Sequence, residues 1–171
     1  VAAMRLLVTG GTGSFGSAFT EHMLSRGHRV TVFSRDELKQ AELAAHLPGA
    51  NYVLGDIRDA DRLCHAMWGH DVIVHAAAMK RVPECEANPA ECIVTNVIGS
   101  RNVVLAASRV GCNAVALSTD KAAAPDNVYG ATKLLTERMF LEAGFSVVRC
   151  GNIWGSRGSI VPLLREQAKT G

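Results

Sequence analysis

A tyrosine and a lysine four residues apart are the first groups in this chain that could do chemistry together. Tyr129 and Lys133 occupy positions i and i+4, so a helix would carry both on one face. A nearby ammonium favours phenolate, and we expect it to lower the pKa of Tyr129 toward the working pH. Such a tyrosine can take a proton from a substrate hydroxyl while a hydride leaves for a nicotinamide. The pair therefore predicts the acid–base centre of a dinucleotide-dependent reaction.

Three further reactive side chains lie just upstream of this pair, at the end of a predicted strand. Thr119, Asp120 and Lys121 offer a hydroxyl, a carboxylate and an ammonium in succession. The spacing Tyr-x-x-x-Lys is common by chance, but it becomes specific when it follows such a strand end and a dinucleotide loop. Asp120 and Lys121 could alternatively form only an exposed ion pair after the strand.

A glycine-rich loop follows the first apolar run and precedes a helical pattern. Gly10 permits a tight turn, Gly13 lets a pyrophosphate approach the backbone, and Gly16 lets the helix pack close to the sheet. Unpaired N–H groups at the helix start would receive the negative charge. Because strand, loop and helix stand in the required order, we expect a dinucleotide pyrophosphate at Gly10, Thr12, Gly13, Ser14, Phe15 and Gly16.

The end of the second predicted strand indicates which dinucleotide is bound. An acidic residue about 20 positions after the loop would hold the ribose hydroxyls of NAD. That position holds Ser34, with Arg35 beside it. A guanidinium suits a 2′-phosphate, so NADP is the predicted cofactor and NAD the second choice. Asp36 is the rival residue, because a register shift of one position would make it the NAD ligand.

Later positions extend the candidate cofactor site. Asp56 and Ile57 follow the third strand, and the carboxylate of Asp56 could bind the adenine amine or cap a helix from Ile57 onward. Three small residues follow the fourth strand; they would let a flat cofactor lie against the sheet edge, or they are simply helix formers: Ala76, Ala77 and Ala78. We expect His75, just before them, to be a packed strand-end residue rather than a catalyst.

The elements that must position these residues alternate along the whole chain. The apolar runs predicted as strands are residues 5–9, 29–33, 51–54, 71–75, 113–118 and 145–149. The expected helices are residues 14–26, 37–46, 59–68, 89–110 and 129–143, with a further helix start at 159–168. This alternation requires right-handed crossovers, and continuously apolar strands are typical of a buried parallel sheet. We therefore predict an α/β fold, a Rossmann-type doubly wound parallel sheet with helices on both faces, in one dinucleotide-binding domain at 1–171.

Composition excludes several other classes of protein. The 171 residues are 48% hydrophobic and 20% charged, which is ordinary for a globular domain and rules against disorder and coiled coil. The 18 Lys and Arg residues are scattered and only 5% of the chain is aromatic, so a nucleic-acid surface is not expected. No apolar run approaches membrane-spanning length. The five cysteines form no C-x-x-C pair, which predicts no disulfide framework and no metal site and favours the cytoplasm.

Taken together, these motifs resemble the extended short-chain dehydrogenases/reductases over essentially the whole chain. The resemblance rests on the phosphate loop, on Tyr129 with Lys133, and on Asn96 in Thr95-Asn96-Val97. Within that superfamily, residues 33–40, 75–80, 117–123 and 155–159 resemble the nucleotide-sugar 4,6-dehydratases that invert C5 and act on UDP-N-acetylglucosamine. The Asp-Lys pair at 120–121 is the most specific sign, because C5-retaining dehydratases usually carry Asp-Glu there and 4-epimerases usually have neither.

The resemblance implies a role for each reactive residue. Oxidation at C4 through Tyr129 would produce a ketone that acidifies the C5 proton. Lys121 is then implied as the base that removes this proton, and Asp120 as the acid for the departing water. Thr119 would hold the C4 hydroxyl in line with the tyrosine. Because Lys121 must be neutral to act as a base, we expect it to be buried or to lie near the ammonium of Lys133.

Other implications of the resemblance are looser. Lys80 would lie near the mouth of the site and, like Tyr129 and Lys133, would also bind the cofactor. Asn152 and Arg157 would approach substrate or nicotinamide. Arg157 could bind a diphosphate through its planar guanidinium or be a solvated loop residue. Members of the family carry roughly as much chain again, which supplies uridine and sugar contacts. We therefore expect this chain to be the cofactor domain with its substrate half missing or truncated.

Two alternative functions stay open at this point. One is a 4-epimerase or reductase of the same superfamily, and the other is a dinucleotide-binding fragment without turnover. The implied partner is a UDP-sugar, with no nucleic acid and no membrane. Family resemblance and the long predicted helices at 89–110 and 129–143 also suggest a homo-oligomer.

Overall fold

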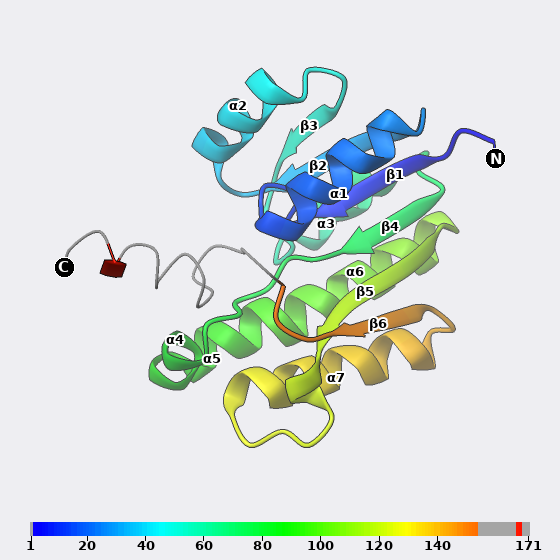
Figure 1. Cartoon of the computed structure of the whole chain (residues 1–171). Helices are drawn as coiled ribbons and strands as arrows, with labels where there is room; N and C mark the ends of the chain where they lie inside the picture. Colours follow the sequence, from blue (N-terminus) through cyan, green and yellow to red (C-terminus); the bar gives the residue numbers. More distant parts are fainter. Residues whose placement is uncertain (1, 154–166, 169–171) are drawn as a thin grey trace.

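The computed structural model describes residues 2–153 and 167–168, and its centre is a parallel sheet with strand order β3-β2-β1-β4-β5-β6 (Figure 1). The strands are β1 (Arg5–Thr9), β2 (Arg29–Ser34), β3 (Asn51–Leu54), β4 (Val72–His75), β5 (Asn113–Thr119) and β6 (Ser146–Cys150). The chain returns from β3 at one edge to β4 beside β1, so the strand order reverses between β1 and β4. That reversal is the point where doubly wound folds bind their ligands. The predicted fold class is confirmed.

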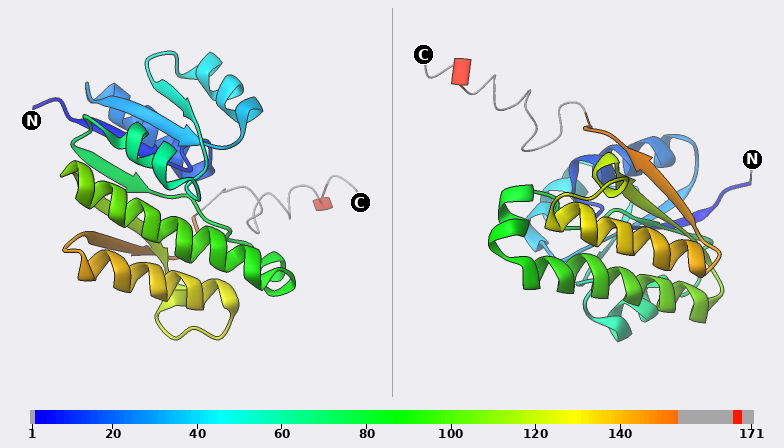
Figure 2. Two further views of the ribbon diagram at one scale, coloured as in Figure 1. Left: turned by 180° about the vertical axis from the view of Figure 1, so that it is seen from behind. Right: turned by 90° about the horizontal axis from the view of Figure 1, so that it is seen from below.

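Helices cover both faces of the sheet. α1 (Ser14–Ser25) and α2 (Glu37–His46) lie on one face, whereas α3 (Ala60–Met67), α6 (Gly99–Val110) and α7 (Val128–Glu142) lie side by side on the other (Figure 2). The remaining elements are short: α4 (Val82–Ala87), α5 (Pro89–Ile93), the π-helical turn η1 (Val94–Ile98) and the 3-10 turn η2 (Asp120–Ala122).

Burial of the central strands explains why these apolar runs form a sheet. Every residue of β1 and β2 after the first is buried. Leu7 and Ile73 pack toward the face covered by α3, α6 and α7, whereas Leu6 and Val8 pack toward α1. Apolar side chains therefore cover both faces of the strands. Polar side chains can gather only where the strands end.

Side-chain caps set the start of three helices. Asp36 accepts a hydrogen bond from the N–H of Lys39 (3.0 Å), Asp59 from Arg62 (2.9 Å), and Asn127 from Gly130 (2.8 Å). Each cap satisfies a backbone donor that the helix leaves unpaired. The caps therefore place the first turns of α2, α3 and α7 directly after the loops that follow the carboxyl ends of β2, β3 and β5.

The prediction of one continuous helix over residues 89–110 is wrong about its continuity. The structure divides it into α5, η1 and α6. Within the π turn, the side chain of Asn96 accepts from Met79 N (2.8 Å) and donates to Met79 O (2.9 Å), which ties it to the segment after β4. The carbonyl of Asn96 accepts from the hydroxyls of Ser100 (2.5 Å) and Thr136 (2.9 Å). These tertiary contacts stabilise a wider turn, and they are not visible in helical periodicity.

Helix α4 was not predicted, because its six residues are too few to show a helical period. The helix start predicted at 159–168 lies almost wholly outside the described residues. In the described part of the chain, no helix is long and apolar enough to cross a membrane. Those residues also contain no group of three or more His, Cys, Asp or Glu side chains that could hold a metal ion.

Candidate active site

A cavity of about 640 Å³ opens at the carboxyl ends of the strands, beside the switch point, and its volume lies within the ordinary range for small-molecule sites. Its lining contains every residue predicted for the cofactor except Tyr129 and Lys133: Gly10, Thr12, Gly13, Ser14, Phe15, Gly16, Ser34, Arg35, Asp56, Ile57, Ala76, Ala77, Ala78 and Lys80. The lining also includes the rival Asp36 and residues that the sequence did not single out for it: Phe33, Lys39, Gly55, Arg81, Thr95, Leu117 and Ile153.

The glycine loop forms a cradle in which an added side chain would collide with backbone. Gly10 has a φ of 67°, and its N–H donates to the carbonyl of Phe33 (2.9 Å). A Cβ at Gly10 would lie 2.7 Å from the backbone nitrogen of Ala77, because the loops after β1 and β4 approach each other there. Helix α1 begins at Ser14 with no acidic residue in its first turn. The cradle and the helix end together fit a pyrophosphate.

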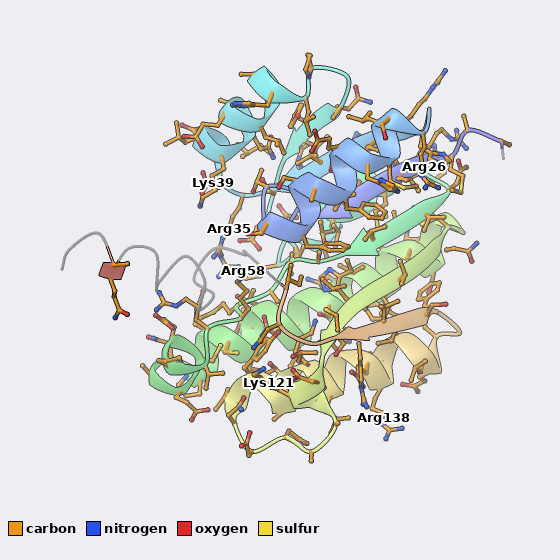
Figure 3. All side chains as sticks on the ribbon, in the orientation of Figure 1. Arg26, Arg35, Lys39, Arg58, Lys121 and Arg138 are labelled. Carbon is orange, nitrogen blue, oxygen red and sulfur yellow. The ribbon has the colours of Figure 1, made fainter. Side chains whose placement is uncertain are left out.

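Charged side chains gather where β2 leads into α2. Arg35 is 57% exposed, and its Nη1 lies 3.5 Å from Asp56 Oδ2. Asp36 accepts the backbone N–H of Lys39 and also pairs with the ammonium of Lys39 at 2.5 Å. Figure 3 shows Arg35, Lys39 and Arg58 at the carboxyl edge of the sheet and Arg26 at the opposite end. The carboxylate of Asp36 therefore caps the start of α2 and also pairs with the ammonium of Lys39.

Asp56 belongs to a chain of charges that reaches α5. Its Oδ2 accepts from Arg58 Nη2 (2.8 Å) and Nε (3.0 Å), and Arg58 Nη1 reaches Glu91 Oε1 at 2.6 Å. Partial burial raises the pKa of Asp56, but the hydrogen bonds and charge of Arg58, with Arg35, outweigh it and hold the pKa below its usual value. The alternative that Asp56 caps a helix from Ile57 onward is wrong, because α3 begins at Ala60 and Asp59 caps it.

The segment after β4 forms neither helix nor strand and brings small side chains to the cavity. Ala76, Ala77 and Ala78 lie outside any helix, so their interpretation as helix formers is wrong. His75 is fully buried; its ring contacts Thr9 Oγ1 (2.7 Å) and Ser100 Oγ (2.9 Å) and stacks on Phe140. Burial lowers the pKa of His75 to about 3, so the ring is neutral. It is a packed strand-end histidine, as predicted.

Thr95 is a candidate binding residue that sequence reasoning did not single out. It lies on η1, is 6% exposed and lines the cavity. Its hydroxyl has no hydrogen-bond partner among the described residues. A buried hydroxyl without a partner is costly, and a polar group entering the cavity would satisfy it. The available signal was its place beside Asn96, whose own side chain is engaged by Met79 and Thr132.

Tyr129 and Lys133 occupy one side of α7, but their electrostatics differ from the prediction. Lys133 is 3% exposed, and its Nζ donates to the carbonyl of Leu117 (2.6 Å), a residue that lines the cavity. Burial lowers the pKa of Lys133 to about 8. Burial also raises the pKa of Tyr129 to about 12, and the hydrogen bond with Thr119 offsets only part of this. The predicted lowering of the tyrosine pKa is therefore wrong in this structure, because desolvation dominates and the ammonium is directed at a carbonyl.

Thr119, Asp120 and Lys121 form one small network where β5 leads into η2. Thr119 Oγ1 donates to Asp120 Oδ1 (2.9 Å), and Lys121 Nζ donates to the same oxygen (3.1 Å). These contacts, that of Thr119 foremost, lower the pKa of Asp120. The side chain of Lys121 is 35% exposed, so its expected burial is not found. In this structure Asp120 and Lys121 form the exposed ion pair that the sequence offered as an alternative.

The three residues to which the resemblance gave the loosest roles, Lys80, Asn152 and Arg157, do not lie together in the described site. Lys80 lines the cavity. Asn152 is exposed after β6 and is not part of the lining, although its neighbour Ile153 is. Arg157 lies outside the described residues.

The fold and the site together define a class of protein. A doubly wound parallel sheet, a glycine cradle at its switch point and a Tyr/Lys pair beside the cavity are the features of a short-chain dehydrogenase/reductase domain with a nicotinamide dinucleotide site. Within that class, the chain belongs to the family described as "Polysaccharide biosynthesis protein", which it matches over residues 6–171.

Curated relatives and solved structures agree with this membership. The chain is 46% identical to a UDP-N-acetylglucosamine 4,6-dehydratase (inverting) of Campylobacter jejuni, over 97% of the chain and 54% of that protein. It is 40% identical to a UDP-glucose 4-epimerase of Rickettsia conorii, again over 97% of the chain and 54% of that protein. The chain therefore spans about half the length of the curated relatives it matches.

Two solved structures have the same architecture. Pen from Bacillus thuringiensis superposes with a TM-score of 0.94 at 40% identity, covering 97% of this chain and 55% of that one. DesIV, a dTDP-glucose 4,6-dehydratase from Streptomyces venezuelae solved with NAD and TYD bound, superposes with a TM-score of 0.85 at 27% identity. That match covers 98% of this chain and 63% of DesIV.

Proposed function

We propose that this chain is the dinucleotide-binding part of an NADP-dependent, C5-inverting UDP-N-acetylglucosamine 4,6-dehydratase, a lyase. The observation that carries the proposal is that two sets of reactive residues adjoin at the start of α7, where Lys133 donates to Leu117 of the cavity lining. Tyr129 and Lys133 lie on α7, and Thr119, Asp120 and Lys121 lie directly before it at the end of β5. The relative of that name from Campylobacter jejuni supports the substrate assignment.

The chemistry assigns each residue a step. Tyr129 takes the proton of the C4 hydroxyl, and Thr119, at the end of β5, holds that hydroxyl in place. A bound nicotinamide would accept the hydride from C4 and return it to C6, so no net oxidation occurs. The C4 ketone acidifies the C5 proton. Lys121 removes this proton, and Asp120 gives a proton to the C6 hydroxyl, which leaves as water. When the hydride returns to C6, C5 takes back one proton from the site, on the opposite face, so that the net change is the loss of one water.

The ion pair of Asp120 and Lys121 is compatible with these roles, because one proton transfer within the pair converts it to the base and the acid that the reaction needs. The Lys121 ammonium already donates to Asp120 at 3.1 Å. Transfer of that one proton would produce a neutral amine, which is a base, and a carboxylic acid, which is an acid. Water favours the charged pair, and a substrate that displaces water from the exposed edge favours the neutral pair. Closure of the site over the substrate would therefore prepare both groups together.

The preference for NADP is carried by Arg35. Its guanidinium lines the cavity beside Ser34, whereas the rival Asp36 already caps α2 and pairs with Lys39. DesIV, more distantly related, was solved with NAD, so this preference needs its own test. Arg35→Ala should weaken NADP binding about tenfold more than NAD binding, because it removes a charge-assisted contact to the 2′-phosphate. Equal loss for both dinucleotides would assign the ribose to Asp36.

The direct experiment is to incubate the chain with UDP-N-acetylglucosamine and catalytic NADP and to follow the sugar nucleotide by mass spectrometry. A 4-keto-6-deoxy product, lighter by one water, is the expected result for a chain that carries the whole reaction. Dinucleotide binding without product would mean that the sugar contacts come from the other half present in longer relatives. Absence of both binding and product would contradict the proposal.

A 4-epimerase is the second candidate, because a UDP-glucose 4-epimerase of Rickettsia conorii is 40% identical. Lys121 distinguishes the two, since an epimerase needs no base at C5. In a protein that turns over, Lys121→Ala should abolish loss of water while C4 oxidation, seen as reduced dinucleotide, remains measurable. A 4-keto-6-deoxy product from that variant would show that another group is the base.

We further propose that the protein works in the cytoplasm as a homo-oligomer with a UDP-sugar as its small-molecule partner. The five unpaired cysteines support a reducing compartment. Exposed leucines on α6 and α7, among them Leu105 and Leu135, support an association face on those helices.

A further inference from the structure

We propose that Gln40 is a positioning residue for dinucleotide selectivity, which directs the hydroxyl of Ser34 to donate a hydrogen bond into the cavity, toward a 2′-phosphate. The inference rests on the proposed dinucleotide function and deepens it. Gln40 lies on α2, is 7% exposed and does not line the cavity. It contacts Ser34, which is 8% exposed and does line the cavity. It would therefore act on a ligand only through another side chain.

The surroundings of Gln40 fix the orientation of its amide. Its terminal atom lies 3.0 Å from the carbonyl oxygen of Ser34 and 2.9 Å from that of Val53. Both carbonyls can only accept hydrogen bonds, so the atom between them must be the NH₂ group and not the amide oxygen. Gln40 thus links the ends of β2 and β3, and its NH₂ group can donate a hydrogen bond to an acceptor beside those two carbonyls.

The same nitrogen lies 3.0 Å from Ser34 Oγ. An amide nitrogen has no lone pair with which to accept, so Ser34 Oγ must be the acceptor in this contact. The hydroxyl hydrogen of Ser34 therefore points away from Gln40. Among the described residues Ser34 Oγ has no other side-chain or backbone partner, and Ser34 lines the cavity, so its hydrogen is available to a ligand there.

A donor hydroxyl at this place favours an anion over a neutral group. Arg35 supplies positive charge beside it. A hydroxyl that donates to a phosphate dianion makes a stronger bond than one that donates to the ribose hydroxyl of NAD. The orientation set by Gln40 should therefore contribute to the preference for NADP over NAD and have little effect on the part of the affinity that both dinucleotides share.

The test is a double-mutant cycle read as the ratio of the dissociation constants of NAD and NADP, measured by titration calorimetry on the whole chain. Ser34→Ala should lower this ratio roughly tenfold, the size of one charge-assisted hydrogen bond. Gln40→Met should lower it by several-fold, because the hydroxyl can then rotate away. In the Ser34→Ala background, Gln40→Met should cause no further change in the ratio.

Tyr52→Phe is the matched control, because the Tyr52 hydroxyl donates to Leu47 O (3.0 Å) between α2 and β3 but lies outside the cavity. It should lower the thermal midpoint and leave the ratio unchanged. An unchanged ratio in Ser34→Ala overturns the proposal even if Gln40→Met does not fold. Equal and additive effects of both substitutions overturn it as well. A wild-type chain that binds neither dinucleotide contradicts the proposed function instead.

Discussion

At the scale of single residues, burial rather than charge sets the state of the acid–base pair. Desolvation disfavours the charged form of each group, so it raises the pKa of Tyr129 to about 12 and lowers that of Lys133 to about 8. The site thus holds a neutral phenol beside an ammonium that loses its proton readily. A phenolate at working pH requires further positive charge, which an oxidised nicotinamide in the adjoining cavity would provide.

Lys133→Met should stabilise the fold in a pH-dependent manner. The folded pKa of Lys133, about 8, is below its ordinary 10.5, so between these values the unfolded chain holds a proton that the folded chain has released. Wild-type stability therefore rises through this window relative to the variant. The fall in the pKa from 10.5 to about 8 corresponds to about 3 kcal/mol, so at pH 7 the variant should be more stable by about that amount. Urea unfolding from pH 7 to pH 10.5 measures this difference, which should shrink as the pH rises. A difference that stays constant would mean that Lys133 is not desolvated.

Thr95→Val should change stability and binding in opposite directions. Its buried hydroxyl has no partner among the described residues, so an isosteric apolar side chain should raise the free energy of unfolding by about 1 kcal/mol. If a dinucleotide uses that hydroxyl, its affinity should fall several-fold. Thr20→Val is the control, because the Thr20 hydroxyl is also buried and without a partner in the described part of the chain, but Thr20 lies on α1 outside the cavity. Both variants should be stabilised, and a loss of affinity in the control would contradict the assignment.

At the scale of elements, the sequence predicted what local patterns determine. Apolar runs located all six strands to within a residue or two, and Asp59 and Pro89 marked helix starts correctly. What it could not predict depends on contacts between distant segments. The π turn at η1 follows from the bonds between Asn96 and Met79, and the pKa of Tyr129 follows from its burial. The alternative that Asp56 caps a helix from Ile57 onward failed because α3 begins three residues later, at Ala60, where Asp59 is the cap.

The packing of η2 against α7 gives a second prediction at this scale. A Cβ on Gly130 would collide with the carbonyl oxygen of Lys121, so Gly130→Ala must displace the turn that carries Asp120 and Lys121. We expect a loss of about 2 kcal/mol in the free energy of unfolding, as for other overpacked sites. Dinucleotide affinity should stay within about twofold, because a contact outside the cavity adds little to ligand binding.

Ala131→Gly is the comparison for this variant. It lies in the same turn of α7 and is exposed, so it weakens the helix by about 1 kcal/mol without displacing Lys121. Chemical denaturation of both variants and calorimetric titration with NADP provide the measurements. If Gly130→Ala is no more destabilising than Ala131→Gly, the contact between η2 and α7 is not tight.

At the scale of the whole molecule, the described residues line an open cavity for a dinucleotide and leave the candidate sugar-binding edge exposed. The cavity is lined from the glycine cradle to Leu117, whereas Asp120 and Lys121 are 60% and 35% exposed. The chain spans about half the length of its curated relatives. These facts support the proposal that this part of the chain binds the cofactor and carries the reactive groups, whereas the additional length of the relatives covers the substrate.

That division predicts how ligands stabilise the chain. NADP at a hundred times its dissociation constant should add about 2.7 kcal/mol to the free energy of unfolding. For a protein of this size that is a rise in thermal midpoint on the order of 5–10 °C. UDP-N-acetylglucosamine alone should produce no comparable rise, because the edge that carries Asp120 and Lys121 is exposed and lies outside the cavity lining. Differential scanning fluorimetry with each ligand separately and then with both measures this. A large shift with the sugar nucleotide alone would mean that this chain binds it unaided, and the proposed division between cofactor and substrate halves would then be wrong.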